Sequence, residues 1–200
     1  LLVDFDFTRC HPGHAVFKNA RFVGSASFGE ATFSGDAVFD GATFSGVASF
    51  AGATFRGDAW FNGAAFCEYV WFDRVTFSKH VVFEDATLNG GVGFDQTTFS
   101  KDALFGGATF SGLIRFVGVS FDETAWFEEA TFNGNVSFSE SKFLGVAVFN
   151  GTAFVRSPDF NEAVASLPSS KHVWPPPWTT QTTSSDSNTA SLIVAATEGS

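Results

Sequence analysis

The chain has 200 residues, a net charge of −10 at pH 7, 28 Phe, 20 Gly and no Met. An acidic chain without clustered Lys and Arg lacks the groups that neutralise phosphates, which argues against direct nucleic-acid binding. Two cysteines are too few for a disulfide framework, and no run of about 18 apolar residues predicts a membrane span. Because there is no initiating Met, we expect Leu1 not to be the natural start, and an upstream part, a membrane segment included, stays open.

Residues 1–14 precede the regular pattern and are expected to be a lead-in or a cap over an open β edge. They contain Cys10, His11 and His14, three residues of metal-ligating types close together. A structural zinc site takes four ligands, usually from two separated pairs, and no second pair lies nearby. We therefore predict no metal site here.

From Phe17 onward, large apolar residues that we call rungs recur with spacings alternating between five and six. One set runs every 11 residues from Phe17 to Phe160 and a second from Phe22 to Phe154, and Leu88 is the one rung that is not Phe. Two residues before a rung the side chain is usually Ala, which gives the period-two alternation of a β-strand. Gly is frequent two residues after a rung, where the chain must turn. Rungs five or six apart would wander around a helix, so the pattern predicts short strands joined by corners.

The rungs alone allow a coil of 11 or of 22 residues, and the outward residue before each rung of the first set separates the two. Every 22 residues this position is apolar: Val16, Val38, Trp60, Val82, Leu104, Trp126, Val148. The interleaved series is mostly polar: Ser27, Ser49, Trp71, Gly93, Arg115, Ser137, Asp159. An 11-residue coil would mix the two series. We predict coils of 22 residues, about six and a half of them over residues 17–160, with Phe50 stacked on Phe28 and Phe72.

Segments such as residues 42–46 and 108–112, both Ala-Thr-Phe-Ser-Gly, recur along the chain. In them the chain resembles the pentapeptide-repeat family, whose unit reads roughly Ala-(Asp/Asn)-(Leu/Phe)-x-x. The resemblance covers about residues 15–160 and implies an all-β fold, a right-handed quadrilateral parallel β-helix (a solenoid) with four units per coil. The chain departs from the family pattern by often having Thr in place of Asp or Asn. It also inserts a residue in every second unit, as at Asp36, Asp58, Tyr69, Asp102 and Leu113.

After Phe160 the rungs stop, and residues 161–200 contain Trp174-Pro-Pro-Pro-Trp178 and a Thr/Ser tract. Low complexity with few large apolar residues predicts a disordered tail. Two alternatives stay open: residues 161–167 as one helical turn over the last coil, and the Trp-Pro segment as a ligand for an aromatic groove.

Carboxylates flank the apolar series on both sides. Paired carboxylates act as acid and base in a cleft, whereas a regular rod offers a flat face, so we expect solvated edges or part of a recognition surface. His80 shares a column with Asp58 and Asp102, but neither a Ser nucleophile nor an oxyanion hole accompanies them. The sequence therefore predicts no enzyme and no cofactor.

An exposed apolar ridge along a rod is typical of an interface. We predict a non-enzymatic repeat scaffold or protein–protein interaction module that binds a protein partner or a second copy. The sequence does not fix its location: the cytoplasm is favoured, and attachment to an upstream membrane segment stays open. The predicted interaction face is Val38, Trp60, Val82, Leu104, Trp126 and Val148, with Asp36, Asp58, Asp102, Asp40, Glu84 and Glu128 beside it. The alternative implied by the resemblance is a DNA-mimicking topoisomerase-binding protein, which needs a strongly negative surface and a C-terminal dimerising segment. A remote alternative is ice binding through Thr columns such as Thr32, Thr54, Thr76 and Thr98.

Overall fold

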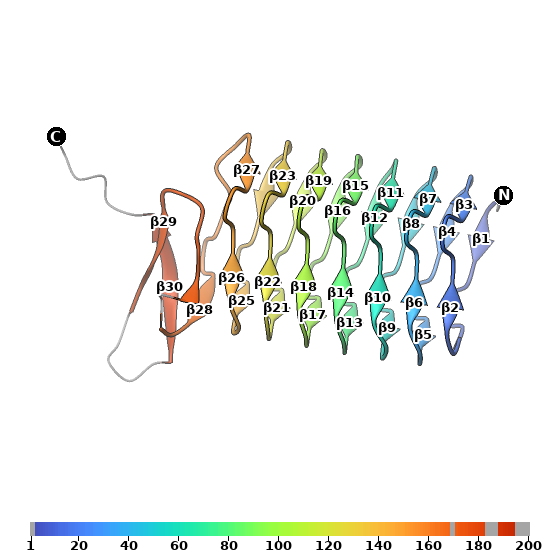
Figure 1. Ribbon diagram of the computed structural model, residues 1–200, viewed down its shortest axis with the longest axis horizontal. Helices are drawn as coiled ribbons and strands as arrows, with labels where there is room; N and C mark the ends of the chain where they lie inside the picture. Colours follow the sequence, from blue (N-terminus) through green and yellow to red (C-terminus); the bar gives the residue numbers. More distant parts are fainter. Residues whose placement is uncertain (1–2, 169–170, 183–187, 195–200) are drawn as a thin grey trace.

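The computed structural model describes residues 3–168, 171–182 and 188–194. They form a four-sided parallel β-helix of about seven coils, with about 22 residues per coil (Figure 1). Each coil gives one short strand to each of four sheets. The predicted fold class and the 22-residue coil are therefore confirmed.

The sheet that begins with β2 carries the apolar outward series. Its strands, in spatial order, are β2 (Ala15–Val16), β6 (Ala37–Val38), β10 (Ala59–Trp60), β14 (Val81–Val82), β18 (Ala103–Leu104), β22 (Ala125–Trp126) and β26 (Ala147–Val148). The β1 sheet lies half a coil away, on the opposite side. Its strands are β1 (Phe5–Asp6), β4 (Ala26–Ser27), β8 (Ala48–Ser49), β12 (Val70–Trp71), β16 (Val92–Gly93), β20 (Ile114–Arg115) and β24 (Val136–Ser137).

The remaining two sides carry the second set of rungs. The β3 sheet comprises β3 (Arg21–Phe22), β7 (Thr43–Phe44), β11 (Ala65–Phe66), β15 (Thr87–Leu88), β19 (Thr109–Phe110), β23 (Thr131–Phe132) and β27 (Ala153–Phe154). The β5 sheet comprises β5 (Thr32–Phe33), β9 (Thr54–Phe55), β13 (Thr76–Phe77), β17 (Thr98–Phe99), β21 (Ser120–Phe121) and β25 (Lys142–Phe143), followed by β28 (Val164–Ser166), β30 (Thr189–Val194) and β29 (Trp178–Gln181).

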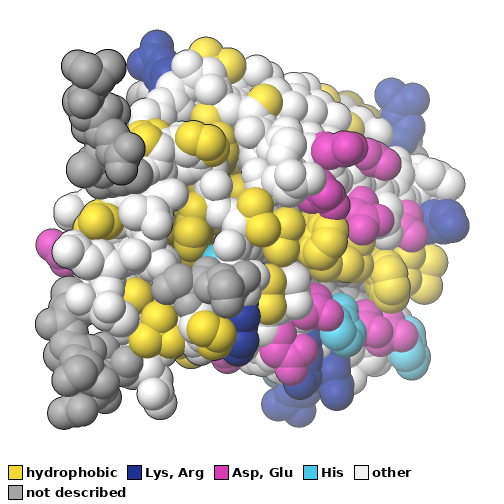
Figure 2. Space-filling view, turned by 60° about the vertical axis from the view of Figure 1, so that its left-hand side comes forward, with side chains coloured by type: hydrophobic (Ala, Val, Ile, Leu, Met, Phe, Trp, Pro, Cys, Tyr) yellow, Lys and Arg dark blue, Asp and Glu magenta, His cyan; other side chains and the backbone are white. Residues whose placement is uncertain are grey.

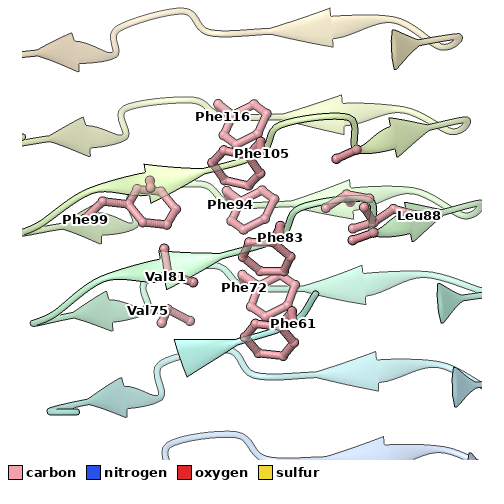
Figure 3. Close-up of a cluster of buried hydrophobic side chains, with 14 of the residues drawn as sticks. Phe61, Phe72, Val75, Val81, Phe83, Leu88, Phe94, Phe99, Phe105 and Phe116 are labelled. Carbon is pink, nitrogen blue, oxygen red and sulfur yellow. The ribbon is translucent and has the colours of Figure 1, made fainter. Parts of the chain in front are cut away.

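Phe rings fill the interior in stacked columns. Phe50 lies nearly parallel to Phe28 and Phe72, with ring centroids 4.7 and 4.8 Å apart, so the predicted stacking is confirmed. Rings from the opposite β1 and β2 sheets interleave edge to face, as Phe94 and Phe83 do at 5.8 Å (Figure 3). Burying such a ring contributes roughly 1.5–3 kcal/mol, and edge-to-face contact adds about 0.5–1.5 kcal/mol.

The corners need glycine for two different reasons. After rungs of the first set the backbone is left-handed, as at Gly41 (φ 62°), and a side chain is carried there only at some cost, as at Arg74 (φ 56°). After rungs of the second set the coils approach closely. A Cβ added to Gly57 would lie 2.5 Å from the carbonyl carbon of Gly35. Glycine is therefore favoured after rungs of the first set because the backbone is left-handed there. After rungs of the second set it is favoured because a side chain would collide with the neighbouring coil.

The first coil begins inside the segment expected to be a lead-in. β1 pairs in parallel with β4, and Phe5 lies opposite Ala26. The rings of Phe5 and Phe7 pack on one another and on Phe17. This strand raises the length of the β-helix from the predicted six and a half coils to about seven.

The tail differs from its prediction. Where residues 161–200 are described, they form β28, which extends the β5 sheet in parallel, and the antiparallel strands β29 and β30. The ring of Trp174 lies 5.2 Å from that of Phe143, and the ring of Trp178 lies 5.2 Å from that of Phe160. Disorder is therefore wrong for these residues, and a strand replaces the helical turn.

The physical reason lies in the last coil, which would otherwise leave its rings and its β edge uncovered. The tail supplies two indole rings that pack on the last rings and three strands that extend the β5 sheet. The middle of the Thr/Ser tract, residues 183–187, lies outside the described residues.

Candidate functional site

The outward side chains of the β2 sheet form one continuous row, because its strands are paired in register. Trp60 lies between Val38 and Val82, and Leu104 lies between Val82 and Trp126. We call the outward residues Val16, Val38, Trp60, Val82, Leu104 and Trp126 the apolar row. Figure 2 shows a hydrophobic band with acidic side chains on both sides of it.

Exposure varies along the apolar row. Val16 is 70% exposed and Trp126 is 36% exposed, whereas Trp60 is half-buried and Val82 is only 5% exposed. Val148, the last member of the predicted face, forms a bridge with Val173 and is 9% exposed. The tail thus covers the C-terminal end of the predicted face, and the two Trp residues are the aromatic side chains of the apolar row.

The carboxylates that precede the row are tied to the backbone of the next coil. Asp36 Oδ1 accepts a hydrogen bond from the Asp58 N–H (3.0 Å), and Asp58 Oδ1 accepts one from the His80 N–H (3.1 Å). In the same way Asp102 Oδ1 accepts a hydrogen bond from the Thr124 N–H (3.0 Å). These side chains satisfy corner N–H groups that no strand pairs, so their first role is structural.

Carboxylates also follow the row, and four of them line a hollow. Asp40 Oδ1 accepts hydrogen bonds from the backbone N–H and the side-chain amide of Asn62. Farther along, Gly106 and Gly107 leave an open hollow of about 370 Å³, with Trp126 at its edge. The carboxylates that line it are Glu84, Asp85, Glu128 and Glu129. The structure thus gathers two of the predicted site carboxylates, Glu84 and Glu128, around the more exposed Trp.

In the column that contains His80, the imidazole ring lies close to one carboxylate. His80 Nδ1 lies 3.3 Å from Asp102 Oδ2, while Asp58 binds the backbone of His80 and not its ring. Near the N-terminus, His14 Nδ1 accepts a hydrogen bond from the Asp36 N–H at 3.1 Å. Within the described ranges, no three His, Cys, Asp or Glu side chains are grouped so as to hold a metal ion. The same residues include no helix long and apolar enough to cross a membrane.

Sequence reasoning missed a notch on the opposite side of the rod. It has a volume of about 180 Å³ and is lined by Tyr69, Trp71, Asp73, Gly91, Val92, Gly93, Asp95, Leu113 and Arg115. Its signal is visible in the outward series of the β1 sheet, which runs Trp71, Gly93, Arg115 on successive coils. A small residue between two large ones in register leaves a gap on the surface. Sequence reasoning considered only whether this series is polar and so did not see the gap.

Four parallel sheets around a core of stacked rungs define a β-solenoid repeat protein. A family model described as pentapeptide repeats (9 copies) matches residues 39–87 and 94–142. The chain belongs to the pentapeptide-repeat family, and it is a repeat scaffold. A comparison with curated proteins found no match to the chain.

Proposed function

We propose that the chain is a non-enzymatic interaction module that binds a protein partner through the apolar row and the carboxylates beside it. The observation that supports this most is Trp126, which remains 36% exposed at the edge of the carboxylate-lined hollow. Interfaces concentrate binding energy in aromatic anchors surrounded by a polar rim. Trp60, three coils away on the same row, is the second anchor.

The charge around the row favours a basic partner over a second copy. The chain carries a net charge of −10, and acidic side chains flank the row on both sides (Figure 2). Two copies joined row to row would bring like charges together, which costs free energy and slows association. A partner with apolar side chains and Lys or Arg around them fits both the row and its rim.

The Thr column named in the ice-binding alternative is short. On the β5 sheet Thr32, Thr54, Thr76 and Thr98 are in register, but Ser120 and Lys142 follow them. A single Thr per strand also follows from its β preference at an outward site. We therefore keep protein binding as the proposed function.

The test is a double variant, Trp60→Ser with Trp126→Ser, compared with Trp71→Ser on the opposite side of the rod. Affinity for a partner captured from the native host is expected to fall by about tenfold or more for each anchor removed from the row. The melting temperature should stay nearly unchanged, because these side chains point outward. Trp71→Ser should capture the partner as the wild type does.

A concentration series in an analytical ultracentrifuge separates a partner from self-association. Capture of the same proteins by the double variant, together with a monomeric wild type at every concentration, would refute the proposal. Val and Trp in the row would then reflect only their preference for strands.

A further inference from the structure

The notch on the β1 sheet is a hollow that the regular coil does not produce. Trp71, Gly93 and Arg115 are paired in register on three successive coils. Since the middle residue has no side chain, the outer two are separated by two strand spacings, roughly 9.6 Å. The Asp73 carboxylate lies over Gly93 in this gap, and the remaining space of about 180 Å³ is large enough for one planar group.

One wall of the notch is aromatic and faces solvent. The rings of Tyr69 and Trp71 lie 6.2 Å apart with an interplanar angle of 18°. They are 55% and 40% exposed, and Leu113 on the far wall is 54% exposed. Large apolar groups left in water forfeit favourable burial, so this wall is a surface that gains from being covered.

The notch also holds a carboxylate without a cation in contact. Asp73 Oδ1 accepts a hydrogen bond from the Asp95 N–H at 3.0 Å, and in the described part of the chain no hydrogen bond or ion pair reaches Asp73 Oδ2. Burial raises the pKa of Asp73, and the charges of Arg115 and Arg74 offset this only partly. Arg115 is engaged elsewhere, because its Nε and Nη2 lie 2.8 and 2.7 Å from Asp95 Oδ2.

We propose that the notch is a binding site for a guanidinium group, as an arginine side chain of a peptide or protein presents it. A planar cation stacks on the exposed face of Trp71 and donates hydrogen bonds to Asp73 Oδ2. Its charge also offsets the cost of burying that carboxylate. An anion would be repelled by Asp73 and Asp95, and a purely apolar group would bury Asp73 without a partner.

The experiment titrates the full 200-residue chain with N-acetyl-arginine amide and follows amide and indole signals by NMR. We expect saturable shifts at Tyr69, Trp71, Gly91 and Gly93. N-acetyl-citrulline amide has nearly the same shape without the charge and is expected to bind about tenfold more weakly, because it lacks the cation–π and ionic contributions. The inference does not rest on the proposed function, because the apolar row lies on the opposite sheet.

Two variants and one control locate the site. Trp71→Ser removes the stacking surface, and Asp73→Asn removes the charge while keeping an oxygen for the Asp95 N–H; each should weaken binding about tenfold. Val155→Ser, at a side chain that is 66% exposed and lies outside the notch and the apolar row, should leave the affinity unchanged, and circular dichroism should show all three variants folded. The proposal is overturned if no saturable shift occurs or if citrulline binds as tightly as arginine. Unchanged affinity in both notch variants, or a loss in Val155→Ser, would overturn it as well.

Discussion

Each rung residue is held by its neighbours above and below. Phe94 is fully buried and stacks on Phe72 at 4.9 Å and on Phe116 at 4.8 Å. This spacing equals the distance between parallel strands, so the ring column and the backbone ladder share one repeat. Leu88, the one aliphatic rung, is equally buried. Apolar volume is therefore the first requirement at a rung, and ring stacking is the second.

Replacing Phe94 with Ala should lower the free energy of unfolding by about 3–5 kcal/mol, because the coils on either side cannot collapse into the space. Phe94→Leu is the matched control and should cost clearly less, since Leu88 already occupies a rung. Chemical denaturation measures both variants. A loss near zero for Phe94→Ala would mean that the ring contributes little to the core.

A second prediction concerns the carboxylates at the corners. Asp58→Ala leaves the His80 N–H without its acceptor and should cost about 1–3 kcal/mol. Asp58→Asn keeps an acceptor oxygen and should recover most of that stability. Urea denaturation of the two variants compares them directly. An equal loss in both would show that charge, and not the hydrogen bond, is what matters at this corner.

Among the elements, the tail is the one that is held in place by packing on the last coils of the β-helix. Trp174 packs its ring against Phe143, Phe149 and Phe160 of the last coils. Trp174→Ser should therefore release the tail to limited proteolysis while the β-helix resists. Trp174→Phe should keep the tail protected, since the indole N–H has no hydrogen-bond partner among the described residues. Equal cleavage of wild type and Trp174→Ser would show that the tail does not pack in solution.

His172 gives the tail a dependence on pH. Its Nδ1 accepts a hydrogen bond from the Ala147 N–H at 3.1 Å, and its Nε2 lies 2.8 Å from the Ser166 carbonyl oxygen. This arrangement requires the neutral ring, and burial lowers the pKa of His172 below its ordinary value near 6.5. The stabilising contribution is therefore complete above about pH 6.5 and is lost as pH falls through the lowered pKa.

Proteolysis of the tail should accordingly become faster as pH falls below about 6.5, and His172→Gln should flatten this dependence. A protease active across the whole range, with a tail-free control substrate, corrects for changes in the protease itself. Tail cleavage with the same pH dependence in wild type and His172→Gln would contradict the assignment.

At the scale of the whole molecule, the parts predicted correctly are those that repeat. The rungs follow from their spacing, and columns such as Phe28, Phe50 and Phe72, like the apolar row, follow from reading the outward residues every 22 positions. The hollow and the notch were missed because each depends on glycines meeting larger residues across coils. The tail was missed because its order comes from the surface it covers, which low complexity does not reveal.

Deletions at this scale test how the rod is built. Removing residues 95–105 takes out one 11-residue unit and should leave a folded rod, because rungs still stack on rungs. Partner capture should then fall as it does in Trp126→Ser, since Trp126 moves to the side opposite Trp60. Removing residues 95–116 should keep both on one side, one coil closer and without Gly106 and Gly107, so capture should fall less than in the shorter deletion. Circular dichroism and capture assays measure both, and unfolding of the shorter deletion alone would show that the corners set the register.

Interior and surface obey different symmetries. The rungs repeat every 11 residues, which gives the interior an approximate twofold screw axis along the rod, whereas the outward columns repeat every 22 residues and break that axis. A recombination event that adds or removes one 11-residue unit therefore leaves the stacking of the rungs intact. It also moves every outward side chain that follows the change to the opposite side of the rod. Selection can act on new combinations of surfaces while the core stays as it was, because the core does not distinguish the side of the apolar row from the side of the notch.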